Sequence, residues 1–398
     1  MKKYYVFFVR DVLPKPAAYV VQIVNLANAA ANLGYSTVLV SLKKGLKAGN
    51  PIEWLSPFHP TKPDDRLAQF YNLQNHLKIV ELPIPWPIDA IESKWTSSST
   101  IVCKYYFPRH ILPHAQLVHS RDWNFVQTAI QHGIPAIYER DHCENKQYDR
   151  KIVGNPLFQA AVTVAAPIRD NLIENGIPPE KVIQLHNGFN QLFLKRQPEK
   201  AEEWRKKLLG DRFKSLAIYA GALYDFKGID MTIEIANQFP EVKFVMAGGP
   251  ETQVEVYRQI TRDKNLNNVE FIGYLEQNPL ASFLQAADIL LYPHLSGEAA
   301  NFTSPMKLFD YIAAGVPIVA TRIPPLKEFQ DLEVVAAWCE PDNPQHLARG
   351  IQQVLEQHSR PSGGYSQNFD RIGQFSWETR ILKTLDYVDT AFQPPVSL

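Results

Sequence analysis

Two stretches of this sequence place charged side chains at the start of a predicted helix. In "YAGALYDFKGIDMTIEIANQF", residues 219 to 239, Lys227 and Gly228 come directly before an amphipathic helix. The unpaired N–H groups of a helix start, with a cation beside them, are suited to binding phosphate. The alternative is an ordinary strand-to-helix turn with a solvated lysine, and these residues alone do not separate the two.

The second stretch, "NFTSPMKLFDYIAAGVPIVAT", covers residues 301 to 321 and predicts a loop, a helix that ends at a glycine and a buried strand. Thr303 or Ser304 can cap this helix, and Pro305 fits its first turn. The amides from about residue 304 to 307 then point outward. Such a set of amides is suited to a diphosphate.

Asp310 is less expected in that helix, because it lies past the first turn, where the helix dipole gives a carboxylate little stabilisation. One interpretation is a surface aspartate that pairs with Lys307 three residues earlier, worth about 0.2–0.5 kcal/mol. The other is a carboxylate that accepts hydrogen bonds from both hydroxyls of a vicinal diol such as ribose. The two interpretations predict different surroundings for Asp310.

Both stretches belong to a chain in which short apolar runs alternate with amphipathic segments from end to end. This pattern predicts an α/β fold with parallel strands and helices on both faces of each sheet. The predicted strands of the first half are "YYVFFV", "STVLVSL", "LKIVEL", "QLVHS", "PAIYER", "AAVTVA" and "KVIQLHNG". Those of the second half are "LAIYAG", "VKFVMAGG", "VEFIGY", "DILLYP", "PIVAT" and "VVAAW".

The length of 398 residues favours two domains of similar size. A charged stretch, "LKRQPEKAEEWRKK", separates two runs of the strand and helix pattern, so we predict Rossmann-like domains over 1–190 and 195–370. A last helix, 375–393, follows the polar break "SRPSGGYSQNFD" and is expected to pack back on the first domain. Two doubly wound domains are expected to face each other across a cleft at the carboxyl ends of their strands, where such sheets bind ligands.

Composition limits the partners and the compartment. The 41 basic and 41 acidic side chains cancel, so no overall field attracts nucleic acid, and a nucleic acid partner is not expected. The three cysteines are far apart and form no C-x-x-C pair, which favours a reducing cytoplasm. The N-terminal run "MKKYYVFFVRDV" is too short for a signal peptide, and no run of 18 apolar residues follows.

Other chemistries find little support in the sequence. His110, His114 and His119 lie close together, but Pro113 breaks a helical spacing of four between them, so no metal site is expected. No D-x-D motif and no G-x-S-x-G nucleophile motif occurs. Glu139, in "YERDH", ends a predicted strand with three further polar residues, which either line a cleft or form a salt-bridged strand end.

Five stretches, in this order, resemble the retaining, nucleotide-sugar-dependent glycosyltransferases of the GT-B fold, that is, glycosyltransferase group 1 or family 4-like proteins. They are "VHSRDWNFVQTAIQHGIPAIYERDH", "VTVAAPIRDNLIENGIPPEKVIQLHNGFNQLF", "YAGALYDFKGID", "VEFIGYLEQNPLASFLQAADILLYP" and "TSPMKLFDYIAAGVPIVAT". Together they span nearly the whole chain. The resemblance therefore implies both the fold and the activity.

The resemblance also implies roles for individual residues. Lys227 would neutralise the diphosphate of the donor, and His119 would reach the transferred sugar across the cleft. Asp310 would bind the ribose diol. The other positions implied to bind the donor are Gly221, Tyr274, Leu275, Glu298, Asn301, Thr303, Ser304, Met306 and Lys307.

Four features depart from the family pattern. Ala222 stands where an arginine often follows the glycine of "AGAL", so one cation for the leaving group is missing. The acidic residue that holds sugar hydroxyls would fall on Phe302, with Glu298 or Asn301 as a substitute. Asp310 stands where glutamate is usual, and the first loop, "RDVLPKPAAY", lacks paired glycines.

We therefore expect a metal-independent glycosyltransferase of the hexosyltransferase type, with retention of configuration implied by the resemblance alone. Its co-substrate would be a nucleoside-diphosphate sugar, and no bound cofactor is expected. The alternatives are a catalytically reduced binding or scaffold protein, indicated by Ala222 and Phe302, and a sugar-nucleotide epimerase or a phosphorylase on the same scaffold.

The acceptor is expected on the N-terminal domain and is a glycan, a lipid carrier or a small molecule. The segment "PIPWPIDAIESKWTSSSTIVCKYYFPRHILP" joins aromatic residues with lysine and arginine. It would meet a sugar, a polyprenyl carrier or the inner face of a membrane, where the protein would bind peripherally. The alternative is an ordinary proline-rich connection.

Overall fold

The chain divides into two compact units. Unit 1 comprises Met1–Asn187 together with Trp377–Leu398, and unit 2 comprises Gly188–Ser376. The predicted boundary between the domains lay slightly later, at residues 190 to 195. The computed structural model describes residues 2–44, 56–74, 76–84, 102–298, 306–365 and 372–396.

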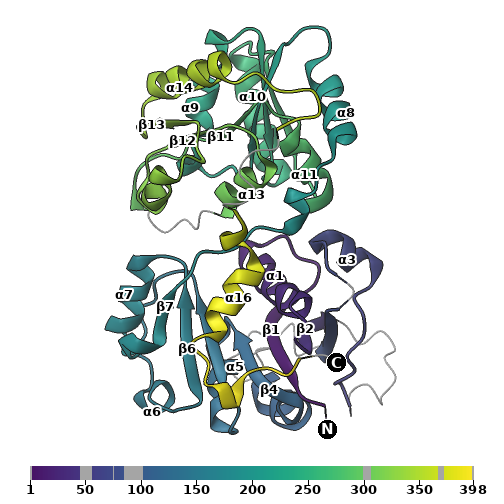
Figure 1. Ribbon diagram of the computed structural model, residues 1–398, viewed down its shortest axis with the longest axis vertical. Coiled ribbons are helices and arrows are strands. Elements are labelled where there is room, and N and C mark those ends of the chain that lie inside the picture. The colour runs from purple at the N-terminus through teal and green to yellow at the C-terminus, as the bar shows by residue number, and fades with distance from the viewer. Residues whose placement is uncertain are drawn as a thin grey trace. The chain divides into compact units, whose positions relative to one another are not determined.

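Unit 1 is built on a parallel sheet in the order β3-β2-β1-β4-β5-β6-β7 (Figure 1). Its strands are β1 (Tyr4–Val12), β2 (Thr37–Lys44), β3 (Lys78–Ile84), β4 (Ala115–Ser120), β5 (Ala136–Arg140), β6 (Phe158–Thr163) and β7 (Val182–Gln184). Its longer helical segments are α1 (Ala18–Asn32), α3 (Asp65–Tyr71), η2 (Val102–Ile111), α5 (Trp123–Gln131), α6 (Arg150–Val153), α7 (Ala166–Glu174) and α16 (Trp377–Leu385). All six residues of β6 are buried, as expected for a strand with helices on both faces.

Unit 2 repeats this plan with a parallel sheet in the order β10-β9-β8-β11-β12-β13. Its strands are β8 (Ser215–Ala220), β9 (Val242–Ala247), β10 (Val269–Gly273), β11 (Ile289–Tyr292), β12 (Ile318–Thr321) and β13 (Ala337–Cys339). Its longer helical segments are α8 (Pro198–Leu209), α9 (Ile229–Ile235), α10 (Glu251–Asp263), α11 (Gln277–Gln285), α13 (Met306–Ala314), η8 (Pro324–Leu332) and α14 (Pro344–Gln357). Two apolar clusters cover the two faces of this sheet.

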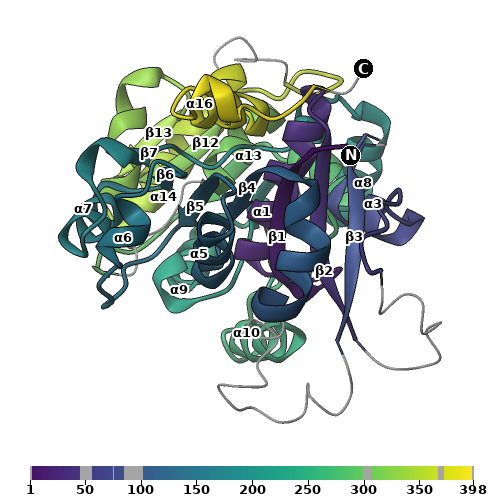
Figure 2. The ribbon, with the colours of Figure 1, turned by 90° about the horizontal axis from the view of Figure 1, so that it is seen from below.

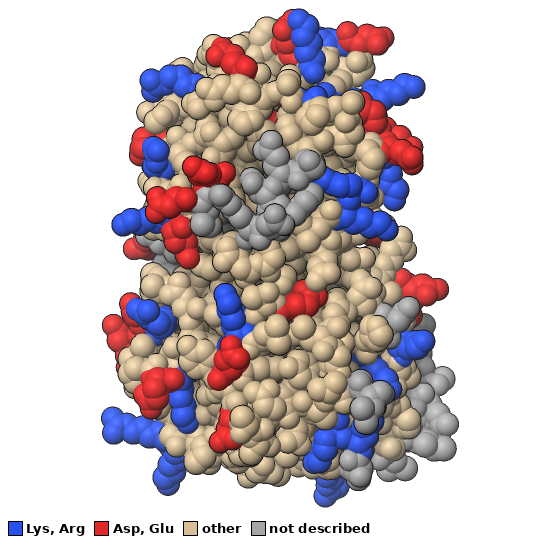
Figure 3. Space-filling view, viewed as in Figure 1, with Lys and Arg blue, Asp and Glu red and all other residues tan. Residues whose placement is uncertain are grey.

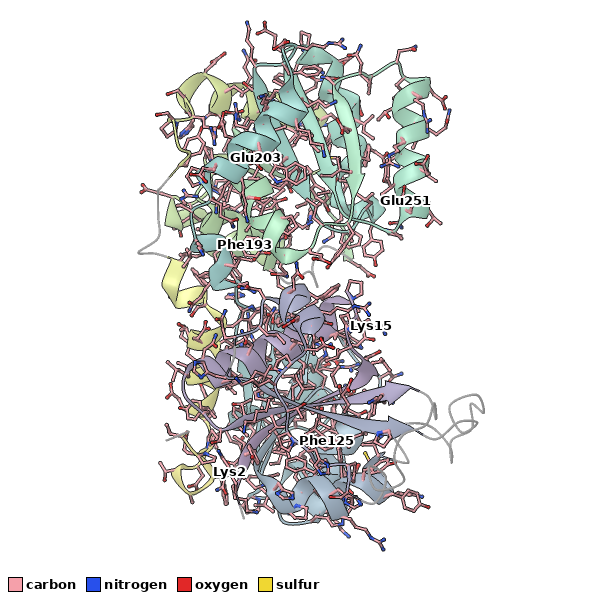
Figure 4. The ribbon with its side chains drawn as sticks, turned by 90° about the vertical axis from the view of Figure 1, so that its right-hand side faces the viewer. Lys2, Lys15, Phe125, Phe193, Glu203 and Glu251 are labelled. Carbon is pink, nitrogen blue, oxygen red and sulfur yellow. The ribbon has the colours of Figure 1, made fainter. Side chains whose placement is uncertain are left out.

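These two sheets confirm the predicted fold class of two doubly wound, Rossmann-like α/β domains. In each sheet the strand order reverses once, between β1 and β4 in unit 1 and between β8 and β11 in unit 2. Ligands of such sheets bind at this switch point, beyond the carboxyl ends of the strands. Figure 4 labels one core side chain of each unit, Phe125 and Phe193, and both are buried.

The C-terminal helix α16 belongs to unit 1, where it packs beside α1 (Figures 1 and 2). The two helices are joined by a hydrogen bond of 3.0 Å, which the side-chain amide of Asn32 on α1 donates to the carboxylate of Glu378 on α16. The face shown in Figure 3 carries acidic and basic side chains interspersed with one another. None of the described helices combines the length and the apolar character that a membrane crossing requires.

Candidate active site

The loop after β8 carries Lys227 to the switch point of unit 2, where it meets the segment that follows β11. Gly228 makes this meeting possible: its φ is +69°, and a Cβ atom there would overlap the carbonyl oxygen of Pro293. The two segments are also hydrogen-bonded, because the N–H of Leu295 donates to the carbonyl of Phe226 over 2.9 Å. The lysine is thus held at the edge where a ligand of this sheet is expected.

Lys227 is a buried cation, with a relative exposure of only 9%. Its Nζ lies 4.5 Å from the ring centroid of Phe226. The ammonium group of Lys227 has neither a hydrogen bond nor an ion pair with any described residue. Burial lowers the pKa of Lys227 to about 8, because removing an ammonium group from water disfavours its charged form. An anion bound beside Lys227 would offset the free-energy cost of removing its ammonium group from water.

A second cation, Lys307 of α13, reaches the same edge of the sheet. Its Nζ donates a hydrogen bond of 2.8 Å to the hydroxyl of Tyr219 and lies 4.0 Å from the centroid of that ring. A Cβ atom at Gly221 would take the place of this ammonium group, so glycine makes room for it. Burial lowers the pKa of Lys307 well below its usual value, the charge of Lys227 lowers it further, and Asp310 opposes both effects.

Lys307 therefore supplies a positive charge next to the place where the sequence lacked one. The family pattern led us to expect an arginine at Ala222, directly after Gly221. The ammonium group of Lys307 comes from another part of the chain to lie over Gly221 instead. A sequence signal was available, because Lys307 lies at the start of the helix that follows β11, and β11 is the neighbour of β8.

Asp310 lies on the same helix and is partly buried. The ion pair with Lys307 that one interpretation required is absent, and the carboxylate has no hydrogen bond to any described residue. Burial raises the pKa of Asp310 to about 8, with the charge of Lys307 opposing this effect. The next residue, Tyr311, fixes the helix against the sheet, since its hydroxyl accepts the N–H of Ala220 over 2.8 Å. Asp310 is thus positioned but unpaired.

The remaining predicted positions lie at different strand ends. Tyr274, with an exposure of 52%, and the partly buried Leu275 follow β10, two strands away from β8. Glu298 is exposed in the segment after β11, and Met306 begins the described part of α13. Asn301, Thr303 and Ser304 lie outside the described residues.

One residue of this edge, His294, was missed by sequence reasoning. It is the second residue after β11, and its ring centroid lies 4.0 Å from that of Tyr292 and 6.2 Å from that of Phe226. Its relative exposure is 0%. The only signal in the sequence was its position after a strand end, which many histidines share.

Unit 1 has a pocket of about 490 Å³ at the carboxyl ends of β1, β4 and β5. Ion pairs join opposite charges within its lining, Arg121 with Asp141 and Arg10 with Asp122. These pairs leave the wall rich in polar groups but without a net field, a surface suited to a neutral ligand with many hydroxyls. The lining residues are Phe8, Val9, Arg10, Asp11, Ala18, Tyr19, Ile23, Arg121, Asp122, Arg140, Asp141 and His142.

His119 does not line this pocket, although it is the second-to-last residue of β4. It has no exposed surface, its Nδ1 lies 2.8 Å from the hydroxyl of Tyr5, and its Nε2 lies 3.0 Å from a carboxylate oxygen of Glu139. The contact with the transferred sugar that the resemblance implied is therefore not offered by this geometry, because both ring nitrogens are already engaged. The histidine instead belongs to a buried network.

Glu139 is the centre of that network and is also fully buried. Its second oxygen accepts a hydrogen bond of 2.8 Å from Arg380 of α16. Burial alone would raise the pKa of Glu139, but the charge of Arg380 and the hydrogen bond from His119 outweigh burial, so the pKa lies below its usual value. Gln22 extends the network to the pocket, because its side chain bonds to both Glu139 and Arg121. Of the polar residues in "YERDH", Glu139 is structural, and the three that follow it line the pocket.

The segment proposed to meet an acceptor or a membrane is only partly described. Residues 85–101 lie outside the described residues, and Val102–Ile111 form η2. Tyr105 on η2 has an exposure of 63%. The neighbouring rings of Tyr106 and Phe107 are buried, so among the described aromatic residues of this segment Tyr105 is the one that is exposed.

The buried Lys227 predicts a pH dependence for anion binding at this edge. As the pH rises through about 8, Lys227 loses its proton in the free protein, so its attraction for a diphosphate falls. A bound anion favours the ammonium form, and binding at pH 8 should therefore take up protons, whereas binding at pH 6.5 should take up none through Lys227. Calorimetric titration with a nucleoside diphosphate in two buffers of different ionisation enthalpy measures this uptake. An equal heat in both buffers at pH 8 would contradict the assignment.

Comparison with known proteins finds a family match in unit 2, the unit that holds Lys227 and Lys307. Residues 200–368 match the family model described as glycosyl transferases group 1. An uncharacterized glycosyltransferase of Methanocaldococcus jannaschii, MJ1607, is 22% identical over 239 residues, which cover 58% of this chain and 60% of that protein. The putative teichuronic acid biosynthesis glycosyltransferase TuaH of Bacillus subtilis is 29% identical over 135 residues, 34% of this chain and 32% of that protein. The chain thus spans less than two thirds of the length of these curated relatives.

Solved structures share the fold over nearly the whole chain. Anabaena HepE in complex with UDP and glucose superposes with a TM-score of 0.66 at 16% identity, over 96% of this chain and 99% of that one. A glycosyltransferase from Rickettsia africae superposes with a TM-score of 0.67 at 14% identity, over 98% of this chain and 100% of that one. At such identities the likeness concerns the fold. Unit 2, which holds Lys227 and Lys307, therefore contains the residues that match the model of the glycosyl transferases group 1, within a chain that shares the fold of these solved structures.

Proposed function

We propose that this chain is a glycosyltransferase that moves a sugar from a nucleoside diphosphate to a hydroxylated acceptor. The observation that carries the proposal is the pair of ammonium groups at the switch point of unit 2, the buried Lys227 and the partly buried Lys307. Two cations removed from water in one place call for a ligand with more than one negative charge. The diphosphate of a sugar nucleotide meets that requirement.

In the proposed reaction the bond between the anomeric carbon and the diphosphate breaks while positive charge builds on the sugar. Charge therefore develops on the departing diphosphate oxygens, where Lys227 and Lys307 would already be placed, without help from a metal. Asp310, which has no partner among the described residues, would accept hydrogen bonds from the ribose hydroxyls. Groups placed in advance in this way lower the barrier because they need no reorganisation during the reaction. The proposal includes retention of configuration and transfer of a hexose.

The donor base is suggested by solved complexes, and the acceptor by the pocket of unit 1. The solved HepE complexes contain UDP, UDP-glucose, or UDP and glucose, so uridine is the first base to test. The pocket of unit 1, balanced in charge and lined by Tyr19 and several ion pairs, suits a saccharide terminus as the acceptor. Two relatives are named for the synthesis of a polysaccharide. TuaH is a putative teichuronic acid biosynthesis glycosyltransferase, and AmsK of Erwinia amylovora is an amylovoran biosynthesis glycosyltransferase.

A thermal-shift screen tests the donor. Uridine, guanosine, adenosine and thymidine diphosphates and their sugars are each added to the protein at pH 7. One base should raise the melting temperature clearly, since a ligand at a hundredfold its dissociation constant adds about 2.7 kcal/mol to the stability of the state that binds it. The variant Lys227→Ala should lose most of that shift.

The same screen decides between the proposal and its alternatives. A protein that none of the four diphosphates stabilises would be a binding or scaffold descendant of the fold and not an enzyme of this class. A protein that binds a sugar nucleotide and converts it to its epimer without any acceptor would be an epimerase.

A further inference from the structure

His294 is a buried histidine whose ring makes no hydrogen bond with any described residue. Its relative exposure is 0%, and neither Nδ1 nor Nε2 has a hydrogen-bond partner in the part of the chain that the structure describes. This differs from His119, which is equally buried but uses both ring nitrogens. Leaving a buried polar group without a partner costs stability. The position therefore calls for an explanation other than packing, for which a phenyl ring would serve better.

The ring of His294 lies near two aromatic rings, Phe226 and Tyr292, each of which has a lysine ammonium group close by. Its centroid is 6.2 Å from that of Phe226, the ring that carries the ammonium group of Lys227 at 4.5 Å. It is 4.0 Å from that of Tyr292, and Nζ of Lys307 lies 6.0 Å from that ring. The imidazole and the two ammonium groups thus form one cluster of nitrogen groups at the ends of β8 and β11.

The backbone holds His294 in this place. The hydroxyl of Thr321 donates a hydrogen bond of 2.7 Å to the carbonyl of His294. The next residue, Leu295, is bonded through its N–H to the loop that carries Lys227. Burial lowers the pKa of His294 well below its usual value, and the charges of Lys227 and Lys307 lower it further. The ring is therefore neutral at pH 7, with one N–H that donates and one nitrogen that accepts.

We propose that His294 is a third binding group for the diphosphate of the donor, and that its ring N–H donates to a phosphate oxygen held by Lys227 and Lys307. This inference rests on the proposed function. A neutral donor adds a directed hydrogen bond without a third buried charge, which two neighbouring ammonium groups would repel. The cost of the unpaired ring in the free protein is recovered when the ligand binds.

The test uses the full chain and the nucleoside diphosphate that gives the largest shift among the four in the screen above. In His294→Phe, affinity at pH 7 should fall about tenfold to a hundredfold, the range expected for a lost hydrogen bond to a charged group. The melting temperature of the free protein should stay the same or rise, because no hydrogen bond is lost in the free state. Calorimetry gives the first quantity and a thermal scan without ligand gives the second.

His119→Phe is the matched control, because it removes an equally buried imidazole that is satisfied. It should lower the melting temperature, since Tyr5 and Glu139 lose their partner, and should leave the affinity of unit 2 for the diphosphate unchanged. If His294→Phe instead lowers the melting temperature and leaves the affinity for the diphosphate unchanged, the proposal is wrong.

A spectroscopic measurement covers the case in which His294→Phe loses both stability and affinity. In wild-type protein labelled with ¹⁵N-histidine, the ring nitrogens of His294 should move to hydrogen-bonded values when the diphosphate is added, and should stay in the neutral range. If they do not move, the inference is wrong, although binding that depends on Lys227 would leave the proposed function standing. If no diphosphate binds the wild-type protein, the proposed function itself is wrong.

Discussion

Replacing Lys227 by alanine should lower the rate of sugar transfer about a hundred- to a thousandfold, the usual effect of losing one group that stabilises developing charge. The ammonium group is buried and has no counter-ion among the described residues, so its removal takes away a desolvated charge and no hydrogen bond to that part of the chain. The stability of the free protein should therefore stay the same or rise. Release of nucleoside diphosphate from the sugar nucleotide, followed over time, measures the rate. Thermal unfolding of the same sample measures the stability.

Lys206→Ala is the control for this experiment, because Lys206 is an exposed lysine on α8 of the same unit. It should leave both the rate and the melting temperature unchanged. Wild-type turnover in Lys227→Ala would remove this lysine from the mechanism, and with it the observation on which the proposed function mainly rests.

Replacing Arg380 by methionine should destabilise unit 1 by about 3–5 kcal/mol, the cost of leaving one partner of a buried ion pair without its counter-charge. Arg380 is 3% exposed and bonds to the carboxylate of Glu139 over 2.8 Å. It also bonds to the carbonyls of Leu185 and His186, directly before the chain leaves unit 1. Urea unfolding, with the transition of unit 1 followed separately, measures the loss.

The loss in Arg380→Met should shrink as the pH falls from 7 towards 5. In the wild-type protein the pKa of Glu139 lies below its usual value, so its contribution to stability is present above the pKa of the unfolded chain and is lost only as the pH falls through the folded value. Without Arg380, burial dominates and raises the pKa of Glu139, so protonation at lower pH relieves the variant. A loss that is independent of pH would indicate a packing defect instead.

Arg169→Met provides the comparison on the surface of the same unit. Arg169 pairs with Asp170 at 2.8 Å, and the side chains are 43% and 55% exposed. Solvent screens such a pair, and its loss should change stability by no more than about 0.5 kcal/mol. The two arginines therefore separate the effect of a buried pair from that of an exposed one.

Much of the fold was predictable because the signals for it are local. Continuous apolar runs predicted the strands of two parallel sheets, since strands covered by helices on both faces bury every side chain. The order of strands and helices then restricted the topology, because parallel connections are right-handed and short. Lys227 was predictable for the same reason, since a cation before a helix start is visible in a few consecutive residues.

The sequence alone thus determined two doubly wound domains and one lysine at a helix start. Tertiary structure decided which side chains share a site. It placed Lys307 over Gly221 and His294 near the two lysines. It also enclosed His119 in a network with Glu139 and Arg380. The physical reason is that burial, charge and pKa depend on neighbours far along the chain. Glu139 and Arg380 are 241 positions apart, and no local pattern of residues records that they meet.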